Sequence, residues 1–396
     1  MPSTQKKSNV IVYTKILYIL LHSIQIMWFL VSFAGTEVMG KDTPEQHKVH
    51  AKEAVEQEFK GWVERMGARY DAKHAADAGD SLASTQTYTF ANQLRTVTTK
   101  TIVVNQKGKG NYKTVQAAVN SIKQGNKQRV VIQINPGVYR EKIKIPSTKP
   151  YITFYGPAGA AKTILVYGDT AAKAGSTSLS ASTTVMSDGF IARGISFRNS
   201  APAPVGGAVG RQAVALLIQG DKAAFYTCSF YGAQDTLYDK SGRHYFKNCY
   251  IQGSIDFIFG DGQSYYEKCH LNSIANPGSG SLTAQKRSSK GEDTGFSFVG
   301  CVVTGSGPIY LGRAWGPYSR VVFIRTYIED LIIPAGWYDW GLSSRRKTVY
   351  YGQYKCSGPG ANTKGRVNWS LELTDAQARP FKTISFIDGA SWLSSL

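Results

Sequence analysis

A short pattern recurs along the second half of the chain and constrains its fold more than any other feature. An aromatic residue stands three positions before a cysteine in FYTCSF, FKNCYI, YEKCHL and FVGCVV, whose cysteines are Cys228, Cys249, Cys269 and Cys301. Successive cysteines are 21, 20 and 32 residues apart, which fits a coil of about twenty residues with one longer loop. The segments SFRNSA and FIRTYI extend the pattern on either side. This period predicts a solenoid, most simply a parallel β-helix, in which equivalent residues stack along one axis.

The local sequence also favours an all-β fold. Short β-prone runs such as TIVV, RVVIQI and YITFYG are separated by Gly, Asn and Pro. One segment, YKTVQAAVNSIKQ, has helical spacing and carries Val115, Ala118, Val119 and Ile122 on one face. We therefore predict an all-β solenoid with a short N-terminal helix that caps one end of the stack.

The first hundred residues differ from the rest and predict export. Lys6 and Lys7 precede a mostly apolar stretch from Asn9 to Phe33, so we interpret residues 1–34 as a signal peptide or signal anchor. Residues 35–99 are charged and Ala-rich, which is typical of a helical or disordered linker. The predicted catalytic domain spans residues 100–396, and the protein is expected to be secreted.

The cysteines are interpreted as structural. The sequence has five of them, including Cys356, and it has no CxxC motif, so a buried ladder of small side chains is favoured over a metal site. Stacked strands about 4.8 Å apart would also permit disulfides in an exported protein. The pairing is left open. We predict no metal and no cofactor.

The charge of the chain predicts an anionic partner. Lys and Arg number 46 against 27 Asp and Glu, which gives a net charge of +19. A nucleic acid, a membrane surface or an acidic polymer would each suit this excess. Because the chain is expected to be exported, we set nucleic acid aside and favour an acidic extracellular polymer.

Two acidic residues occupy the same position in consecutive coils. Asp235 follows Cys228 by seven residues, and Asp256 follows Cys249 by seven. If the repeat is correct, their carboxylates lie about one strand spacing apart, and their repulsion leaves one ionised and the other able to hold a proton. Each could instead be a turn aspartate that bonds its own backbone. Apolar and aromatic neighbours favour the catalytic interpretation, in which one is an acid and the other a nucleophile.

Five ordered blocks give the chain a resemblance to plant pectinesterases (pectin methylesterases), from about Thr101 to Leu396. They are GVYRE, QAVAL, YGAQDTL, GSIDFIFG and LGRAW, beginning at Gly137, Gln212, Tyr231, Gly253 and Leu311. The resemblance implies a right-handed parallel β-helix that hydrolyses the methyl esters of galacturonate in cell-wall pectin. The N-terminal region has no cysteine, so it does not resemble the inhibitor-like pro-region of longer members.

The resemblance also implies roles for individual residues. Asp256 would be the nucleophile, Asp235 the general acid and then base, and Arg313 the partner that keeps Asp256 ionised. Gln212 and Gln234 would donate hydrogen bonds to the oxyanion. The residues implied to line a groove for the galacturonate chain are Trp315, Tyr238, Phe259 and Trp337. In the same family blocks, Tyr139 is interpreted as a core anchor and Glu141 as a carboxylate that pairs with a nearby base.

Two other functions compete with this one. A β-helical polygalacturonase would also use paired acids, but inverting hydrolases need carboxylates about 6.5 to 9.5 Å apart, wider than neighbouring coils provide. A non-catalytic pectin-binding wall protein would use the basic surface and aromatic groove without turnover. Both alternatives keep pectin as the polyanionic partner. We name a proteinaceous inhibitor as a further candidate partner, expect a monomer, and note Asn368 in NWS as a glycosylation acceptor.

Overall fold

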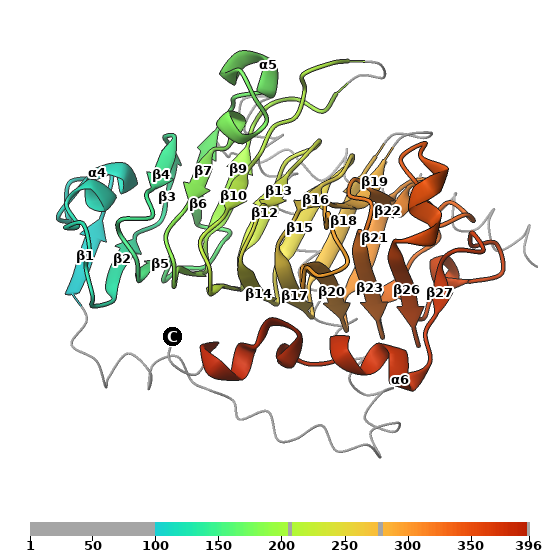
Figure 1. Cartoon of the computed structure of the whole chain (residues 1–396). Coiled ribbons are helices and arrows are strands. Elements are labelled where there is room, and N and C mark those ends of the chain that lie inside the picture. Colours follow the sequence, from blue (N-terminus) through green and yellow to red (C-terminus); the bar gives the residue numbers. More distant parts are fainter. Residues whose placement is uncertain (1–99, 205–207, 276–279, 394–396) are drawn as a thin grey trace, which may run out of the picture. The chain divides into compact units, whose positions relative to one another are not determined.

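A computed structural model describes residues 100–204, 208–275 and 280–393 of the protein. Three parallel sheets form this described part of the chain. Each coil contributes one strand to each sheet in turn, so hydrogen-bonded neighbours within a sheet come from successive coils. Figure 1 shows the coils stacked from the blue end at β1 to the red end at β27. The prediction of an all-β, right-handed parallel β-helix is confirmed.

We call the eleven-stranded sheet A and the two eight-stranded sheets B and C. Sheet A contains β1 (Lys100–Val104), β2 (Val130–Ile134), β5 (Ile152–Tyr155), β8 (Ile191–Arg193), β11 (Ala223–Tyr226), β14 (Arg243–Lys247), β17 (Gln263–Glu267), β20 (Gly295–Val299), β23 (Arg320–Ile324), β26 (Tyr350–Tyr354) and β27 (Leu371–Glu372). Sheet B contains β3 (Gly137–Arg140), β6 (Thr163–Tyr167), β9 (Ser196–Asn199), β12 (Ser229–Tyr231), β15 (Tyr250–Gly253), β18 (His270–Ile274), β21 (Val302–Ser306) and β24 (Tyr327–Ile328). Sheet C contains β4 (Ile143–Ile145), β7 (Thr183–Val185), β10 (Leu216–Ile218), β13 (Leu237–Asp239), β16 (Ile258–Gly260), β19 (Ser281–Gln285), β22 (Tyr310–Ala314) and β25 (Trp337–Tyr338).

Helices are short and lie at the ends and edges of the stack. They are α4 (Val115–Asn120), α5 (Ala171–Ala174), η1 (Ser178–Ser180), η2 (Ser343–Lys347), η3 (Pro359–Ala361), α6 (Asp375–Ala378), η4 (Arg379–Phe381), η5 (Ile384–Ile387) and η6 (Gly389–Ser391). Helix α4 buries Val115, Ala118 and Val119 beside β1 and β2, as the predicted capping helix should.

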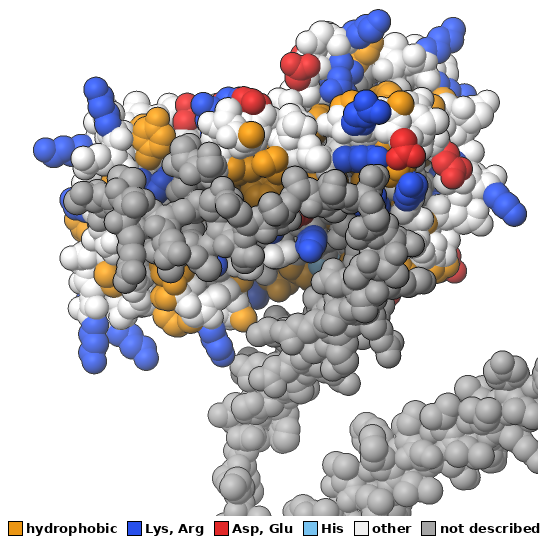
Figure 2. Space-filling view, turned by 90° about the horizontal axis from the view of Figure 1, so that it is seen from below, with side chains coloured by type: hydrophobic (Ala, Val, Ile, Leu, Met, Phe, Trp, Pro, Cys, Tyr) orange, Lys and Arg blue, Asp and Glu red, His pale blue; other side chains and the backbone are white. Residues whose placement is uncertain are grey.

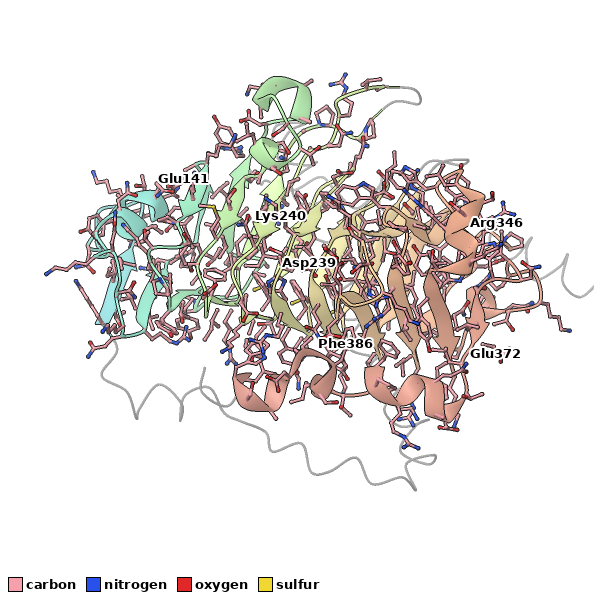
Figure 3. The ribbon with its side chains drawn as sticks, in the orientation of Figure 1. Glu141, Asp239, Lys240, Arg346, Glu372 and Phe386 are labelled. Atoms are coloured by element: carbon pink, nitrogen blue, oxygen red, sulfur yellow. The ribbon has the colours of Figure 1, made fainter. Side chains whose placement is uncertain are left out.

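The GVYRE block around β3 supports α4 in a way that the sequence did not predict. Tyr139 is buried and its hydroxyl donates to the carbonyl of Asn135 at 2.8 Å, so the predicted core anchor is present. Glu141, labelled in Figure 3, accepts from the backbone N–H groups of Val115 and Gln116 at 2.8 Å each. The expected basic partner was therefore wrong, because this carboxylate satisfies the free amides at the start of α4 instead.

The cysteine repeat marks the corner between sheets A and B. Thr227, Asn248 and Lys268 have left-handed φ values of 49°, 52° and 51°, and each directly precedes a cysteine. In each of these coils, one residue in the left-handed conformation turns the chain, and the side chain of the cysteine after it points inward. All five cysteines are free thiols, and the four of the repeat are buried, as expected for a packing ladder.

The aromatic positions of the repeat form a continuous stack inside the coils. Phe225, Phe246, Tyr266, Phe298 and Phe323 follow one another with ring centroids 4.5 to 4.7 Å apart and nearly parallel planes. The spacing matches that of parallel strands, so each ring packs on the next coil's ring. The predicted period is thus visible as one aromatic ring per coil.

A buried polar cluster lies beside this aromatic stack. Asp239, labelled in Figure 3, accepts hydrogen bonds from Nδ1 of His244 and from the hydroxyl of Tyr266, both at 2.6 Å. The other ring nitrogen of His244 contacts the carbonyl of Gly220 at 2.9 Å. All three side chains are sealed from solvent, so Asp239 and His244 belong to the core and not to a site.

The C-terminal segment covers part of sheet A. In Figure 1, α6 and the turns after it run along the lower edge of the coils. Phe381 and Phe386, the latter labelled in Figure 3, pack with Tyr245, Tyr265 and other outward residues of sheet A. This segment buries an apolar face that the coils alone would expose.

The predicted signal segment (1–34) and linker (35–99) lie outside the described residues. Within the described ranges, no helix is long and apolar enough to cross a membrane.

Candidate active site

The two predicted acids occupy equivalent positions at the corner between sheets B and C. The backbone N–H of Asp235 donates to the carbonyl of Ile255 at 2.9 Å, and Leu237 pairs with Ile258 two residues later. This register places Asp235 and Asp256 on neighbouring coils, about 4.8 Å apart along the axis. Both have left-handed φ values, 64° and 48°, which is tolerated by Asp and is frequent where function fixes the backbone.

Asp256 is held as an ion pair. Its Oδ1 accepts from Nε of Arg313 at 2.8 Å, and its Oδ2 accepts from Nη2 of the same guanidinium. Burial by itself would lower the pKa of Arg313, but the hydrogen bonds and charge of Asp256 outweigh burial and raise it. Two parallel bonds from this permanently charged fork fix the orientation of the carboxylate.

The next coil contributes a third residue to the same column. Ser281 at the start of β19 is fully buried, and its hydroxyl donates to Oδ1 of Asp256. Oγ of Ser281 also accepts a hydrogen bond from the backbone N–H of Asp256 at 3.1 Å. Ser281 therefore fixes both the backbone and the side chain of Asp256.

Asp235 has the opposite environment. It is 8% exposed, and its carboxyl has no hydrogen-bond partner within the described part of the chain. Burial raises the pKa of Asp235 well above its usual value, and the negative charge of Asp256 adds to this, while Arg313 opposes it. Asp235 is thus suited to hold a proton beside an ionised Asp256.

The two glutamines lie at the same corner of the coils. The backbone of Gln234 pairs with Ile255, one residue before the two acids, and its carbonyl accepts from Ala213 N–H at 3.1 Å. Gln212 directly precedes Ala213, and both glutamine side chains are partly exposed. Within the described residues neither side-chain amide is engaged in a hydrogen bond, so both are available to a ligand.

A row of side chains on the outer face of sheet C continues from the acids. Successive strands place Leu217, Tyr238, Phe259, Ala284 and Arg313 in register. The rings of Tyr238 and Phe259 stack at 4.2 Å, and Trp315 lies 6.1 Å from Phe259. Tyr238 and Trp315 are partly exposed beside the acid pair, whereas Phe259 is only 4% exposed and packs against both rings.

The prediction that Trp337 lines the groove is wrong in its placement. Trp337 is 1% exposed and stacks on Tyr351 at 4.4 Å inside the coils. Alternate residues of a strand face opposite sides, so its neighbour Tyr338 is the one in register with Arg313 on the outer face. Trp340, three residues later, is partly exposed and lies beside the acid pair, since the guanidinium of Arg313 is 4.4 Å from its ring centroid.

Sequence reasoning did not single out Ser281 or Lys286. The Nζ of Lys286 lies 4.9 Å from the ring centroid of Trp315. Continuing the column of Asp235 and Asp256 by one more coil would have reached Ser281. The longer interval between Cys269 and Cys301 concealed that register.

Similarity to known proteins agrees with this geometry. A sequence profile of the family described as Pectinesterase matches residues 101–390. The chain belongs to the pectinesterase family. It is 49% identical over 307 residues to "Probable pectinesterase 8" of Arabidopsis thaliana, covering 76% of this chain and 78% of that protein.

Solved structures of the family have the same fold. "Pectin methylesterase from Carrot" has a TM-score of 0.70 and 36% identity, covering 74% of this chain and 95% of that chain. A second, "pectin methylesterase in complex with hexasaccharide VII", has a TM-score of 0.62 and 25% identity, covering 72% of this chain and 96% of that chain. This pectinesterase is a carboxylic ester hydrolase that removes methyl esters from pectin.

The backbones of Asp235 and Asp256 lie about one strand spacing apart, whereas inverting glycosidases hold their two carboxylates about 6.5 to 9.5 Å apart. Within the described ranges, no group of three or more His, Cys, Asp or Glu side chains is arranged to hold a metal ion.

Proposed function

We propose that Asp256 is the nucleophile of this pectinesterase. An oxygen of its carboxylate attacks the C6 carbonyl of a methyl-esterified galacturonate, and the carbonyl oxygen takes the negative charge of a tetrahedral intermediate. The ion pair with Arg313 and the hydroxyl of Ser281 support this role, because together they fix the direction of the carboxylate.

Asp235 is the proton donor and then the proton acceptor in this proposal. Its proton passes to the leaving methoxide, so that methanol departs and an acyl-enzyme anhydride remains on Asp256. A water then gives a proton to Asp235 and attacks the anhydride, which releases the free uronate and regenerates Asp256. The raised pKa of Asp235 supports the first step, since the group must be protonated when substrate binds.

Gln212 and Gln234 are the proposed oxyanion donors. Their amides carry no charge, so they stabilise the tetrahedral oxyanion without pairing with the nucleophile. One such donor contributes roughly 3 kcal/mol to the transition state in other hydrolases. Their partial exposure and free amides support this assignment.

Tyr238 and Trp315 are the proposed platform for the sugar chain, and Phe259, which is 4% exposed, supports their rings. Flat rings suit the apolar faces of pyranose rings, and their row on sheet C runs along the axis of the stack. Trp340 replaces Trp337 in this set because it lies against Arg313 on the outer face. That a relative was solved with a hexasaccharide supports binding of several sugars.

The protein is proposed to act outside the cell, in the wall. The N-terminal sequence supports secretion, and the net charge of +19 supports attraction to a polyanionic wall polymer. Figure 2 shows Lys and Arg side chains projecting along the edges of one face. Asn368 lies exposed in a turn, which supports its use as a glycosylation acceptor, and a monomer that a proteinaceous inhibitor can bind completes the proposal.

Methanol release from pectin tests the catalytic assignment. Asp256→Asn keeps the shape of the side chain but removes the nucleophilic charge, so we expect a loss of at least about 10⁴-fold in kcat. Asp330→Asn is the matched control, because Asp330 is exposed and outside the site. Substantial turnover by Asp256→Asn would overturn the nucleophile assignment, and no methanol from the wild type would favour a binding protein instead.

A further inference from the structure

A second concave site lies on sheet B, whereas the row of Tyr238 and Phe259 lies on sheet C. It has a volume of about 450 Å³ and opens on strands β3, β6, β9 and β12 and on the segment after β9. Its lining includes Gly232 and Ala233, which directly precede Gln234 and Asp235. The groove therefore ends at the corner that carries the catalytic residues.

One row of outward side chains crosses this groove from coil to coil. Strand register aligns Arg140, Val166, Arg198, Tyr231 and Gln252. Arg140 and Arg198 are two strand spacings apart at the backbone, about 9.6 Å. The row thus presents two guanidinium groups along the axis of the solenoid.

Neither arginine has an acidic partner among the described residues. Arg140 is exposed and makes no hydrogen bond or ion pair within the described residues. Arg198 donates from Nε to Oγ of Ser196 at 2.9 Å, and its guanidinium lies 4.3 Å from the ring centroid of Tyr231. These contacts hold Arg198 in place and leave its charge unpaired. Among the described residues that line the groove, none is acidic.

The rest of the groove suits a carbohydrate better than a free ion. Val138, Ile164 and Ile274 give it an apolar floor, and the side-chain amide of Gln252 lies at one side. Apolar C–H faces of sugar rings can cover such a floor, while guanidinium groups bind carboxylates in a planar fork. A polymer with one carboxylate on each free uronate can engage both arginines together.

We propose that this groove is a second binding site, which takes a de-esterified stretch of galacturonan. The inference rests on the proposed function, because the ligand is the product of that reaction. A chain held here raises the local concentration of neighbouring esters at the active site, so the enzyme stays on partly processed pectin. The groove contributes to retention on long polymer and takes no part in the chemistry.

A paired-variant binding experiment tests this site. The probe is a fully de-esterified galacturonate decamer, titrated by calorimetry into Asp256→Asn protein, so the measurement needs no turnover. Adding Arg140→Gln and Arg198→Gln is expected to raise the dissociation constant of one class of decamer sites roughly tenfold. This is the size of effect that the loss of two exposed charge pairs produces. Lys123→Gln with Lys127→Gln removes the same charge from exposed positions outside the groove and should leave both classes unchanged.

Kinetics with intact Asp256 provide the second measurement. The two arginine substitutions should raise KM on long, partly esterified pectin and leave kcat/KM on a short methylated oligomer unchanged. Identical decamer binding by wild-type and substituted grooves would overturn the proposal. If poly-glutamate competed equally well with the decamer, the proposal would also be overturned, since the groove would then bind any polyanion regardless of its sugar rings. Failure of the catalytic proposal would appear separately, as absent methanol release with decamer binding intact.

Discussion

Arg313 and Asp256 meet through two parallel hydrogen bonds, although 57 residues separate them in the chain. Arg313 is on β22 and Asp256 precedes β16, so a full coil lies between them, and β19 supplies Ser281 from that coil. The guanidinium is covered on one face by Trp340. Three coils thus fix the direction of one carboxylate, which is what a nucleophile that must not rotate requires.

The bidentate geometry predicts that a lysine cannot replace Arg313. Arg313→Lys keeps the charge but loses one of the two bonds, so we expect kcat/KM for methanol release to fall roughly 10- to 100-fold. Arg243→Lys is the matched control, because Arg243 donates to Asp221 in the same two-bond arrangement on sheet A, from Nε at 3.0 Å and Nη2 at 2.6 Å. Equal losses in the two variants would contradict a specific role for Arg313.

The raised pKa of Asp235 predicts a pH-dependent effect on stability. Its folded pKa lies above the unfolded value of about 3.9, so the fold favours the protonated form, and the wild type loses this contribution as pH rises through the folded pKa. Asp235→Asn is neutral at every pH. We expect its melting temperature to exceed that of the wild type by more at pH 8 than at pH 4, while methanol release is lost.

Thermal unfolding across that pH range checks this prediction. Asp330→Asn is the control, since Asp330 is exposed and its substitution should give no pH-dependent difference. A difference in melting temperature that is the same at pH 4 and pH 8 would show that burial of the Asp235 charge is not its cause.

Much of the site could be predicted because the repeat fixes position. Once Cys228 and Cys249 are equivalent, Asp235 and Asp256 must share a corner, and a stacked solenoid leaves them only one spacing apart. The repeat does not say which face a residue takes when its strand is two residues long. Trp337 and Tyr338 on β25 illustrate this, because a shift of one position exchanges core and surface. Glu141 was mispredicted for a different reason. Its hydrogen-bond partners are backbone amides of Val115 and Gln116, which no side-chain pattern in the sequence reveals.

Ser281 is predicted to be a positioning residue. Ser281→Ala removes the hydroxyl that donates to Asp256 and accepts from its backbone N–H, so we expect kcat to fall roughly tenfold or more with KM unchanged. Ser281→Thr retains the hydroxyl and should restore most of the activity. Ser297→Ala, which removes a buried hydroxyl bonded to the carbonyl of Phe381 at 2.7 Å, controls for a general loss of packing. A loss that Ser281→Thr does not rescue would argue for a purely structural role.

Substitution of Trp337 should lower stability, whereas substitution of Trp315 should weaken substrate binding. Trp337 is buried against Tyr351, so Trp337→Ala should cost about 3 to 5 kcal/mol of unfolding free energy, measured with denaturant. Trp315 is partly exposed beside Phe259, so Trp315→Ala should leave stability nearly unchanged. Its KM for pectin should rise roughly three- to tenfold, because a stacked ring contributes about that much to contact with a sugar face. The reverse outcome, a stable Trp337→Ala protein with weakened substrate binding, would return Trp337 to the groove and contradict the register of β25.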